Sequence, residues 1–139
     1  SVVDAVSIPV IANGDIRCPD TALQAIAASG AAGVMVGRGA QGRPWLLAQI
    51  GDVLAGRKMR PIPTIRERHE MMRLHLDDMI AHYGPAAMRL ARKHIAWYAH
   101  GLPGAAELRD CANNSTDALR VFAAVDQFFE DLYQRAEAA

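Results

Sequence analysis

Two short polar loops hold the residues of this chain that are best suited to bind an anion. Each follows a run of apolar residues, 8–12 for the first loop and 33–36 for the second. The loops consist of Asn13, Gly14 and Asp15 in one case and of Gly37, Arg38 and Gly39 in the other. Glycine lets a ligand approach the backbone closely, and arginine can donate paired hydrogen bonds to phosphate oxygens. The loops therefore predict a phosphate site, although each alone also fits an ordinary surface turn or an Asx turn.

The separation of the two loops along the chain predicts how they are placed. Asn13 and Gly37 are 24 positions apart, which leaves room for one helix and two turns. Two strands joined through such a helix are parallel, and their carboxyl ends meet at one edge of the sheet. We therefore expect a βαβ unit that brings the loops side by side, as in the phosphate site after strands seven and eight of a (β/α)8 barrel.

The residue pattern divides the chain into two domains of different class. Residues 1–56 have an α/β pattern and predict the last two βα units of a TIM (β/α)8 barrel. Residues 57–139 predict an all-α bundle of about four helices, since apolar residues recur there at helical spacing. A complete barrel needs about 250 residues, so we expect this chain to be the carboxyl-terminal part of a longer protein.

Several residues predict where elements begin, end or face inward. Gly30 is expected to end a helix, and Thr64 with Glu67 forms a capping-box pattern that begins another. The strand at 33–36 is apolar throughout, which predicts burial on both faces. The last helix is expected to be capped by Asn113, Asn114 and Ser115 and to bury Leu119, Phe122, Val125, Phe129 and Leu132. The first long helix is expected to bury Met72, Leu76, Met79, Ile80 and Tyr83.

A second group of candidate functional residues lies in the helical domain. It consists of Arg89, Arg92, Lys93 and His94. Trp97 and Tyr98 follow, and basic residues beside aromatic ones suit RNA, where cations meet phosphates and rings stack on bases. The alternative is a solvated basic stripe next to aromatic residues at the edge of the core. Six further basic residues could extend the same surface: Arg57, Lys58, Arg60, Arg66, Arg68 and Arg73.

The charge distribution favours a polyanionic partner more than the total charge does. The formal net charge is zero, with 15 basic and 15 acidic residues. Residues 57–93 carry nine Lys or Arg against four Asp or Glu, whereas residues 107–139 carry three against seven. This asymmetry predicts a basic surface that faces a polyanion, unless the two segments are solvated helix faces that neutralise each other.

Cysteine, histidine and hydropathy patterns predict no metal site and no membrane span. Cys18 and Cys111 lie far apart without metal-ligand spacing, which fits a reducing compartment and hence the cytoplasm. No carboxylate or cysteine ligand set accompanies the histidines of the first long helix at the spacing that a metal site needs. No stretch approaches 18 uninterrupted apolar residues, and no signal-peptide pattern is visible.

Three segments resemble the carboxyl-terminal part of bacterial tRNA-dihydrouridine synthases of the B-type branch. They are residues 8–16 (IPVIANGDI), 33–46 (GVMVGRGAQGRPWL) and 88–98 (MRLARKHIAWY). The resemblance implies an FMN-bearing TIM barrel followed by a helical tRNA-binding domain. It also implies reduction of the C5–C6 bond of tRNA uridines, with NADPH as the reductant of the flavin.

The resemblance also assigns roles to residues of this chain. It implies that FMN is bound by Asn13, Gly14, Asp15, Gly37 and Arg38, with the last two near its phosphate. The general-acid cysteine of the family lies in an earlier part of the barrel, and neither Cys18 nor Cys111 matches its motif. We therefore expect no catalytic residue here, and no activity from these 139 residues alone.

Two other functions remain open at this level. One is a different FMN- or phosphate-binding barrel oxidoreductase that acts on a small molecule, for which a basic helical domain would have no purpose. The other is a helical RNA-binding module without catalysis, for which the paired loops would have no purpose.

Overall fold

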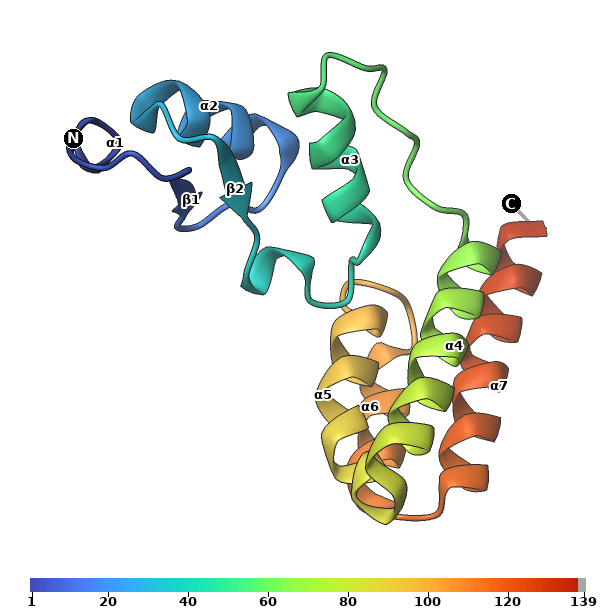
Figure 1. Ribbon diagram of the computed structural model, residues 1–139. Coiled ribbons are helices and arrows are strands. Elements are labelled where there is room, and N and C mark those ends of the chain that lie inside the picture. Colours follow the sequence, from blue (N-terminus) through green and yellow to red (C-terminus); the bar gives the residue numbers. More distant parts are fainter. Residues whose placement is uncertain (138–139) are drawn as a thin grey trace. The chain divides into compact units, whose positions relative to one another are not determined.

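The chain folds into two compact units, each with its own set of internal contacts. The computed structural model describes residues 1–137, and the division between the units falls between Ile62 and Pro63. The first unit contains both strands, and the second is built of helices (Figure 1). No helix in the described part of the chain is long and apolar enough to cross a membrane.

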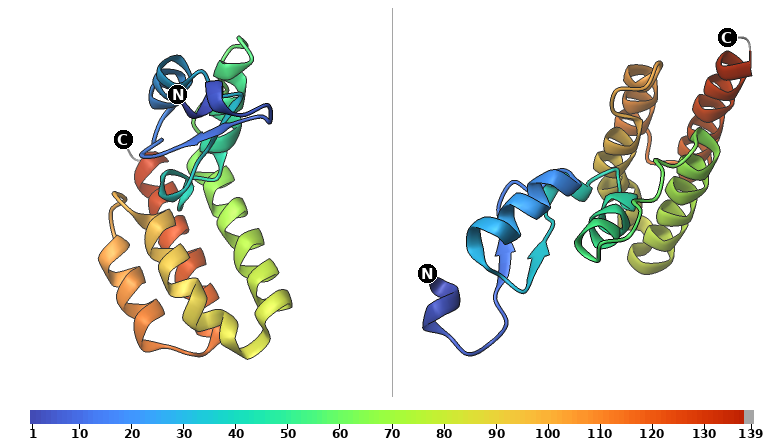
Figure 2. Two further views of the ribbon diagram at one scale, coloured as in Figure 1. Left: turned by 60° about the vertical axis from the view of Figure 1, so that its left-hand side comes forward. Right: turned by 90° about the horizontal axis from the view of Figure 1, so that it is seen from above.

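The first unit contains the predicted βαβ arrangement. Strands β1 (Ile11–Asn13) and β2 (Gly33–Met35) are parallel and in register from Ile11 opposite Gly33 to Asn13 opposite Met35, and α2 (Pro19–Ser29) connects them. Figure 2 shows the two strands side by side. A short helix α1 (Val2–Ala5) precedes β1, and after β2 come a 3₁₀ turn η1 (Arg38–Ala40) and α3 (Trp45–Leu54).

Local sequence signals set the ends of α2. Pro19 occupies its first turn, where the missing N–H has no helical partner to lose. Gly30 ends it in the left-handed conformation (φ 68°) and donates its N–H to the carbonyl of Ile26, as the sequence predicts.

The core of the first unit lies on one side of the strands. Ile16, Ala22, Leu46 and Ile50 are buried together, and Val34 packs against them. Met35, the next residue, is 53% exposed, so the prediction that this strand is buried on both faces is wrong for the described residues. Successive strand side chains point to opposite faces, and α2 and α3 supply the core that Val34 joins.

A buried carboxylate attaches the segment after α3 to the first unit. The Asp52 side chain is only 6% exposed, and its oxygens accept hydrogen bonds from Arg57 (3.1 Å) and Arg60 (2.7 Å). Residues 57–62 consequently belong to the first unit, six residues beyond the boundary predicted after residue 56. The same guanidinium groups lower the pKa of Asp52 far below its ordinary range, with the hydrogen bond from Arg60 as the largest cause.

We expect Asp52→Asn to destabilise the full-length protein at neutral pH, because it leaves two arginines without their anionic partner. Since the folded-state pKa is lowered, the carboxylate stabilises the fold above its unfolded pKa and loses this effect as pH falls through the folded pKa. The difference in Tm between wild type and variant should be several degrees at pH 7 and should shrink below about pH 4. Asp78→Asn, at an exposed position of the second unit, is the matched control and should not change Tm. A difference that grows in acid would contradict this role of Asp52.

The second unit consists of four α-helices and one 3₁₀ turn within the described residues. The helices are α4 (Ile65–Tyr83), α5 (Ala87–Ala99), α6 (Ala105–Asn114) and α7 (Ala118–Glu137), with η2 (Gly84–Ala86) between the first two. Each helix contacts the next, α4 also contacts α7, and successive helices alternate in direction (Figure 1).

The capping box predicted for α4 is present. The Thr64 backbone N–H donates to Glu67 (2.7 Å), and the Glu67 N–H donates to the Thr64 hydroxyl (3.2 Å). Of the side chains predicted to be buried on this helix, Met72, Leu76 and Met79 are buried, but Tyr83 is 50% exposed. Tyr83 is the last residue of α4, where the helix gives way to the Gly84 turn.

The last helix differs from its prediction in its cap and in the first positions of its buried face. The carboxylate of Asp117 accepts the N–H groups of Leu119 (3.0 Å) and Arg120 (3.4 Å), so it caps α7 in place of residues 113–115. Leu119 is 82% exposed rather than buried. The buried stripe consists of Val121, Val125, Phe128, Phe129 and Leu132, so three of the five predicted positions are confirmed, and Phe122 is only half-buried.

A polar network joins α4 to α7. His69 makes one hydrogen bond to the Tyr133 hydroxyl (3.0 Å) and another to Asp126 (2.8 Å), and its ring stacks on Phe129 (4.5 Å between centroids). Arg73 pairs with Asp126 from the same side (3.3 Å). These contacts give His69 a structural role, and within the described residues no three His, Cys, Asp or Glu side chains are grouped to hold a metal ion.

Candidate phosphate site and candidate nucleic-acid surface

The two loops predicted to bind phosphate lie next to each other at the carboxyl ends of β1 and β2. They enclose a cavity of about 340 Å³. Its lining includes Asn13, Gly14, Asp15, Gly37 and Arg38, which are the five residues singled out in the sequence, together with Ile16, Arg17 and Gly39. The βαβ geometry therefore brings together residues that are far apart in the chain.

The loops touch through a glycine. A Cβ at Gly39 would overlap the backbone carbonyl oxygen of Ile16 and would lie 3.2 Å from the Cα of Arg17. Gly37, by contrast, has no atom within 4 Å of its Cβ position, so its Cα faces open space. Gly39 is thus required for the approach of the two backbones, whereas Gly37 leaves room for a ligand.

Arg43 holds the two loops together and was not identified by sequence reasoning. Its guanidinium donates to the carbonyl of Gly39 (2.9 Å) in one loop and to the carbonyl of Arg17 (3.3 Å) next to the other. Arg43 lies directly before Pro44 at the start of α3. An arginine four residues after a loop glycine gave only a weak signal, because its reach across to Arg17 depends on the tertiary fold.

The charges around the cavity favour an anion. Asp15 pairs with Arg17 (2.9 Å) and approaches Arg38 (3.6 Å), so two guanidinium groups face one carboxylate. The Arg38 side chain is 83% exposed, and exposed ion pairs contribute little free energy. Arg38 can therefore exchange this long contact for a phosphate at small cost, while Arg17 continues to neutralise Asp15.

Cys18 has a local structural role beside this cavity. It is the residue before α2, where its backbone N–H donates to the Thr21 hydroxyl (3.1 Å) and its sulfur lies 3.6 Å from the same oxygen. Hydrogen bonds from the Thr21 backbone and side chain lower the pKa of the Cys18 thiol. These contacts make Cys18 the N-cap residue of α2.

The candidate RNA-binding residues of α5 do not all lie together. Arg89 and Lys93 are exposed and His94 is half-buried, and these three line a cavity of about 430 Å³. Arg92 does not line it, and its Nε is buried without a hydrogen-bond partner among the described residues. The structure thus separates Arg92 from the other three.

The wider basic surface suggested by the sequence is reduced by intramolecular contacts. Arg57 and Arg60 are bound to Asp52, which partly neutralises their charge, although their side chains remain 61% and 52% exposed. Arg73 pairs with Asp126 and lies over the Phe122 ring (4.1 Å), and Arg66 lies over the Tyr133 ring (5.0 Å). Within the described part of the chain, Arg89 and Lys93 form no ion pair, so they remain available for an external anion.

The two aromatic residues of α5 differ in burial. Tyr98 is buried, and its hydroxyl lies 3.4 Å from Nδ1 of His75. Trp97 is half-buried and meets His94 edge-on (5.1 Å between centroids). Tyr98 therefore belongs to the core and is not free to stack on a base, in line with the structural alternative considered for it.

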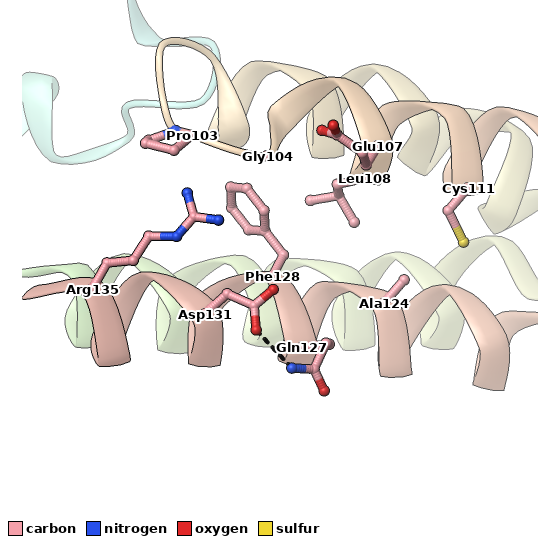
Figure 3. A pocket seen from close by; sticks show the side chains of 10 residues that line it. All are labelled: Pro103, Gly104, Glu107, Leu108, Cys111, Ala124, Gln127, Phe128, Asp131 and Arg135. Carbon is pink, nitrogen blue, oxygen red and sulfur yellow. Dashed lines mark hydrogen bonds between the residues drawn. The ribbon is translucent and has the colours of Figure 1, made fainter.

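A further cavity of about 570 Å³ lies between α6 and α7 and contains none of the candidate phosphate- or RNA-binding residues, although Cys111 lines it. Figure 3 shows Phe128 and Leu108 at its centre, with Glu107, Asp131 and Arg135 around them. Gln127 donates a hydrogen bond to Asp131 (2.8 Å) across one turn of α7. With two carboxylates against one guanidinium, this cavity is poorly suited to a phosphate.

A parallel βαβ unit whose loops converge on an arginine and glycines places the chain in the α/β class and has the arrangement typical of phosphate sites in that class. The model of the family described as dihydrouridine synthase (Dus) matches residues 1–136, so the chain belongs to this family.

Curated relatives agree with the family assignment. The chain is 44% identical over 130 residues to a protein of Rickettsia prowazekii named probable tRNA-dihydrouridine synthase, covering 93% of this chain and 40% of the relative. It is 38% identical over 129 residues to tRNA-dihydrouridine synthase B of Xanthomonas axonopodis pv. citri, covering 92% of this chain and 39% of the relative. A Mycobacterium leprae protein with the name probable tRNA-dihydrouridine synthase is 46% identical over 105 residues, which are 75% of this chain and 27% of the relative. The chain thus spans about 40% of the length of the first two of these relatives.

Proposed function

We propose that the protein containing this chain reduces uridine to 5,6-dihydrouridine in tRNA, with FMN as cofactor and NADPH as reductant. Membership of the dihydrouridine synthase family and the names of the relatives support this activity. The observation that carries it within the chain is the convergence of two loops on Arg38 at the carboxyl edge of parallel strands. The cytoplasm, where tRNA is modified, is the location we propose.

The residues present fit the phosphate end of FMN. Two guanidinium groups against one carboxylate favour an anion, and open space at Gly37 lets it approach the backbone. We assign Gly37 and Arg38 to the phosphate, and Asn13, Gly14 and Asp15 to the neighbouring part of the cofactor. When bound, FMN supplies the hydride for uridine reduction, while these residues bind and orient it.

We assign the helical unit to tRNA binding. Arg89, Lys93 and His94 share one cavity, and Arg92 lies on the same helix. A uridine within folded tRNA is stacked, so it must be extruded to reach a flavin in the barrel. Basic residues that hold the surrounding phosphates would keep the RNA in place during this step.

Neither cysteine of this chain is assigned as the general acid, so we propose that residues 1–139 are inactive by themselves.

We expect Arg38→Ala in the full-length protein to weaken FMN binding on the order of tenfold or more, because a charged hydrogen-bond donor to the phosphate is lost. The measurement is FMN titration of the apoprotein, followed by fluorescence quenching. Arg120→Ala, at an exposed position of α7, is the matched control and should bind FMN as the wild type does. A wild-type protein that purifies without flavin and takes none up would refute the enzyme assignment. FMN binding that is unchanged in Arg38→Ala would refute the role of this residue.

A further inference from the structure

A cavity between α4 and α5 combines aromatic rings, apolar side chains and cations. It has a volume of about 430 Å³, within the range typical of small-molecule sites. His75, Met79 and Tyr83 line it from α4, and Arg89, Leu90 and Lys93 line it with His94 from α5. Both helices belong to the second unit, so the cavity is formed within one compact body.

Two of the three rings that line this cavity are in contact with each other. His75 and His94 meet edge-to-face with their centroids 4.6 Å apart, and the hydroxyl of buried Tyr98 lies 3.4 Å from Nδ1 of His75. Tyr83 is 50% exposed and meets the neighbouring His82 edge-on (4.6 Å between centroids). Burial, and next the proximity of His75, lower the pKa of His94, so its ring is neutral at pH 7. The cavity therefore offers a neutral imidazole and an exposed phenol ring to a planar ligand.

Two cations, Arg89 and Lys93, line the same cavity. Arg89 and Lys93 are four residues apart on α5, so they lie on one face of the helix, and both are exposed. Neither forms an ion pair within the described residues. Leu90, which is 45% exposed, and the buried Met79 add apolar surface to the cavity.

We propose that this cavity binds one unstacked nucleotide of the RNA. Its base would lie against Tyr83 and the apolar side chains of Met79 and Leu90, and its flanking phosphates would contact Arg89 and Lys93. The inference rests on the proposed function, since it takes the RNA partner from there. It adds that the helical unit recognises an unpaired base as well as phosphates. A fully paired A-form helix cannot place a base in such a cavity, because its bases are stacked and its major groove is too narrow for side chains to reach them.

The test compares two RNAs on variants of the full-length protein. One RNA is an unmodified tRNA transcript, which has unpaired bases, and the other is a blunt RNA duplex of similar length. Tyr83→Ala should weaken binding of the transcript on the order of tenfold, because base–aromatic stacking is lost, and should leave duplex binding unchanged. Tyr83→Phe keeps the ring and should bind as the wild type does.

A second variant tests the cavity from α5, because Tyr83 is the last residue of α4 and its substitution can also change the turn that follows. Leu90→Ser removes apolar surface from the cavity at an exposed helical position and should weaken transcript binding severalfold, again without effect on the duplex. Leu74→Ser is its matched control, because Leu74 is 64% exposed on α4 and does not line the cavity. Both dissociation constants are measured by fluorescence anisotropy at one fixed salt concentration.

The possible outcomes separate the two levels of the proposal. Equal weakening of both RNAs by Tyr83→Ala, or no weakening by either cavity variant, would overturn the nucleotide site while leaving tRNA binding intact. A wild-type protein that binds neither RNA would overturn the proposed function itself, and the nucleotide site with it.

Discussion

Gly39→Ala is expected to cost the full-length protein most of its affinity for FMN. The added methyl group would overlap the carbonyl oxygen of Ile16, which is backbone and cannot rotate away as a side chain could. The two loops must separate, which we expect to lower the free energy of unfolding by about 1–3 kcal/mol. Because Arg38 is then displaced relative to Asn13 and Asp15, FMN affinity should fall on the order of 100-fold.

The matched control for this experiment is Gly51→Ala in α3. In contrast to Gly39, its Cβ position meets no atom within 4 Å, and an alanine inside a helix should be neutral or stabilising. FMN titration and thermal unfolding of both variants give the comparison. If Gly39→Ala binds FMN as tightly as Gly51→Ala does, the close approach of the loops is irrelevant to cofactor binding.

The second large effect is expected from charge reversal on α5. The double variant Arg89→Glu, Lys93→Glu should weaken binding of a tRNA transcript by the full-length protein on the order of 100-fold. Both cations lack intramolecular partners, so their reversal breaks no ion pair of the described fold and repels phosphates directly. The negative slope of log K against log salt concentration should become less steep by roughly two, one for each lost phosphate contact.

A control with the same change in net charge distinguishes a local effect from a general one. Arg109→Glu, Arg120→Glu places the same two reversals on α6 and α7, away from the cavity of α5. It should weaken binding far less, and FMN content should be unchanged in both double variants. If binding of the transcript and uridine reduction in tRNA both survive the α5 reversal unchanged, Arg89 and Lys93 have no part in tRNA binding.

Local signals in the sequence were sufficient for much of the secondary structure. Pro19 and Gly30 mark the first turn and the end of α2, and Thr64 with Glu67 begins α4 as predicted. These signals act through the backbone of a few adjacent residues, so tertiary context changes them little. The separation of Asn13 from Gly37 similarly predicted a βαβ unit, because a parallel connection needs a helix of about that length.

Side-chain contacts over longer distances were not predictable in this way. The caps of α7 illustrate this, since three residues before Asp117 offered equally good capping chemistry and only the path of the chain selected Asp117. Apolar spacing correctly predicted Val125, Phe129 and Leu132 as buried, but it also placed Leu119 in the core, although Leu119 is 82% exposed. Similarly, the positive charges of residues 57 and 60 could be counted, but their attachment to Asp52 could not.

For function, the sequence by itself determined the residue types: glycines and an arginine after two apolar runs, and cations beside aromatic residues on a later helix. Only the tertiary structure decided which of them act together. It placed both loops around one cavity, supplied Arg43 to hold them, and left Arg89 and Lys93 unpaired while engaging most other arginines. The physical reason is that backbone preferences are local, whereas burial and ion pairing depend on neighbours that are distant in the chain.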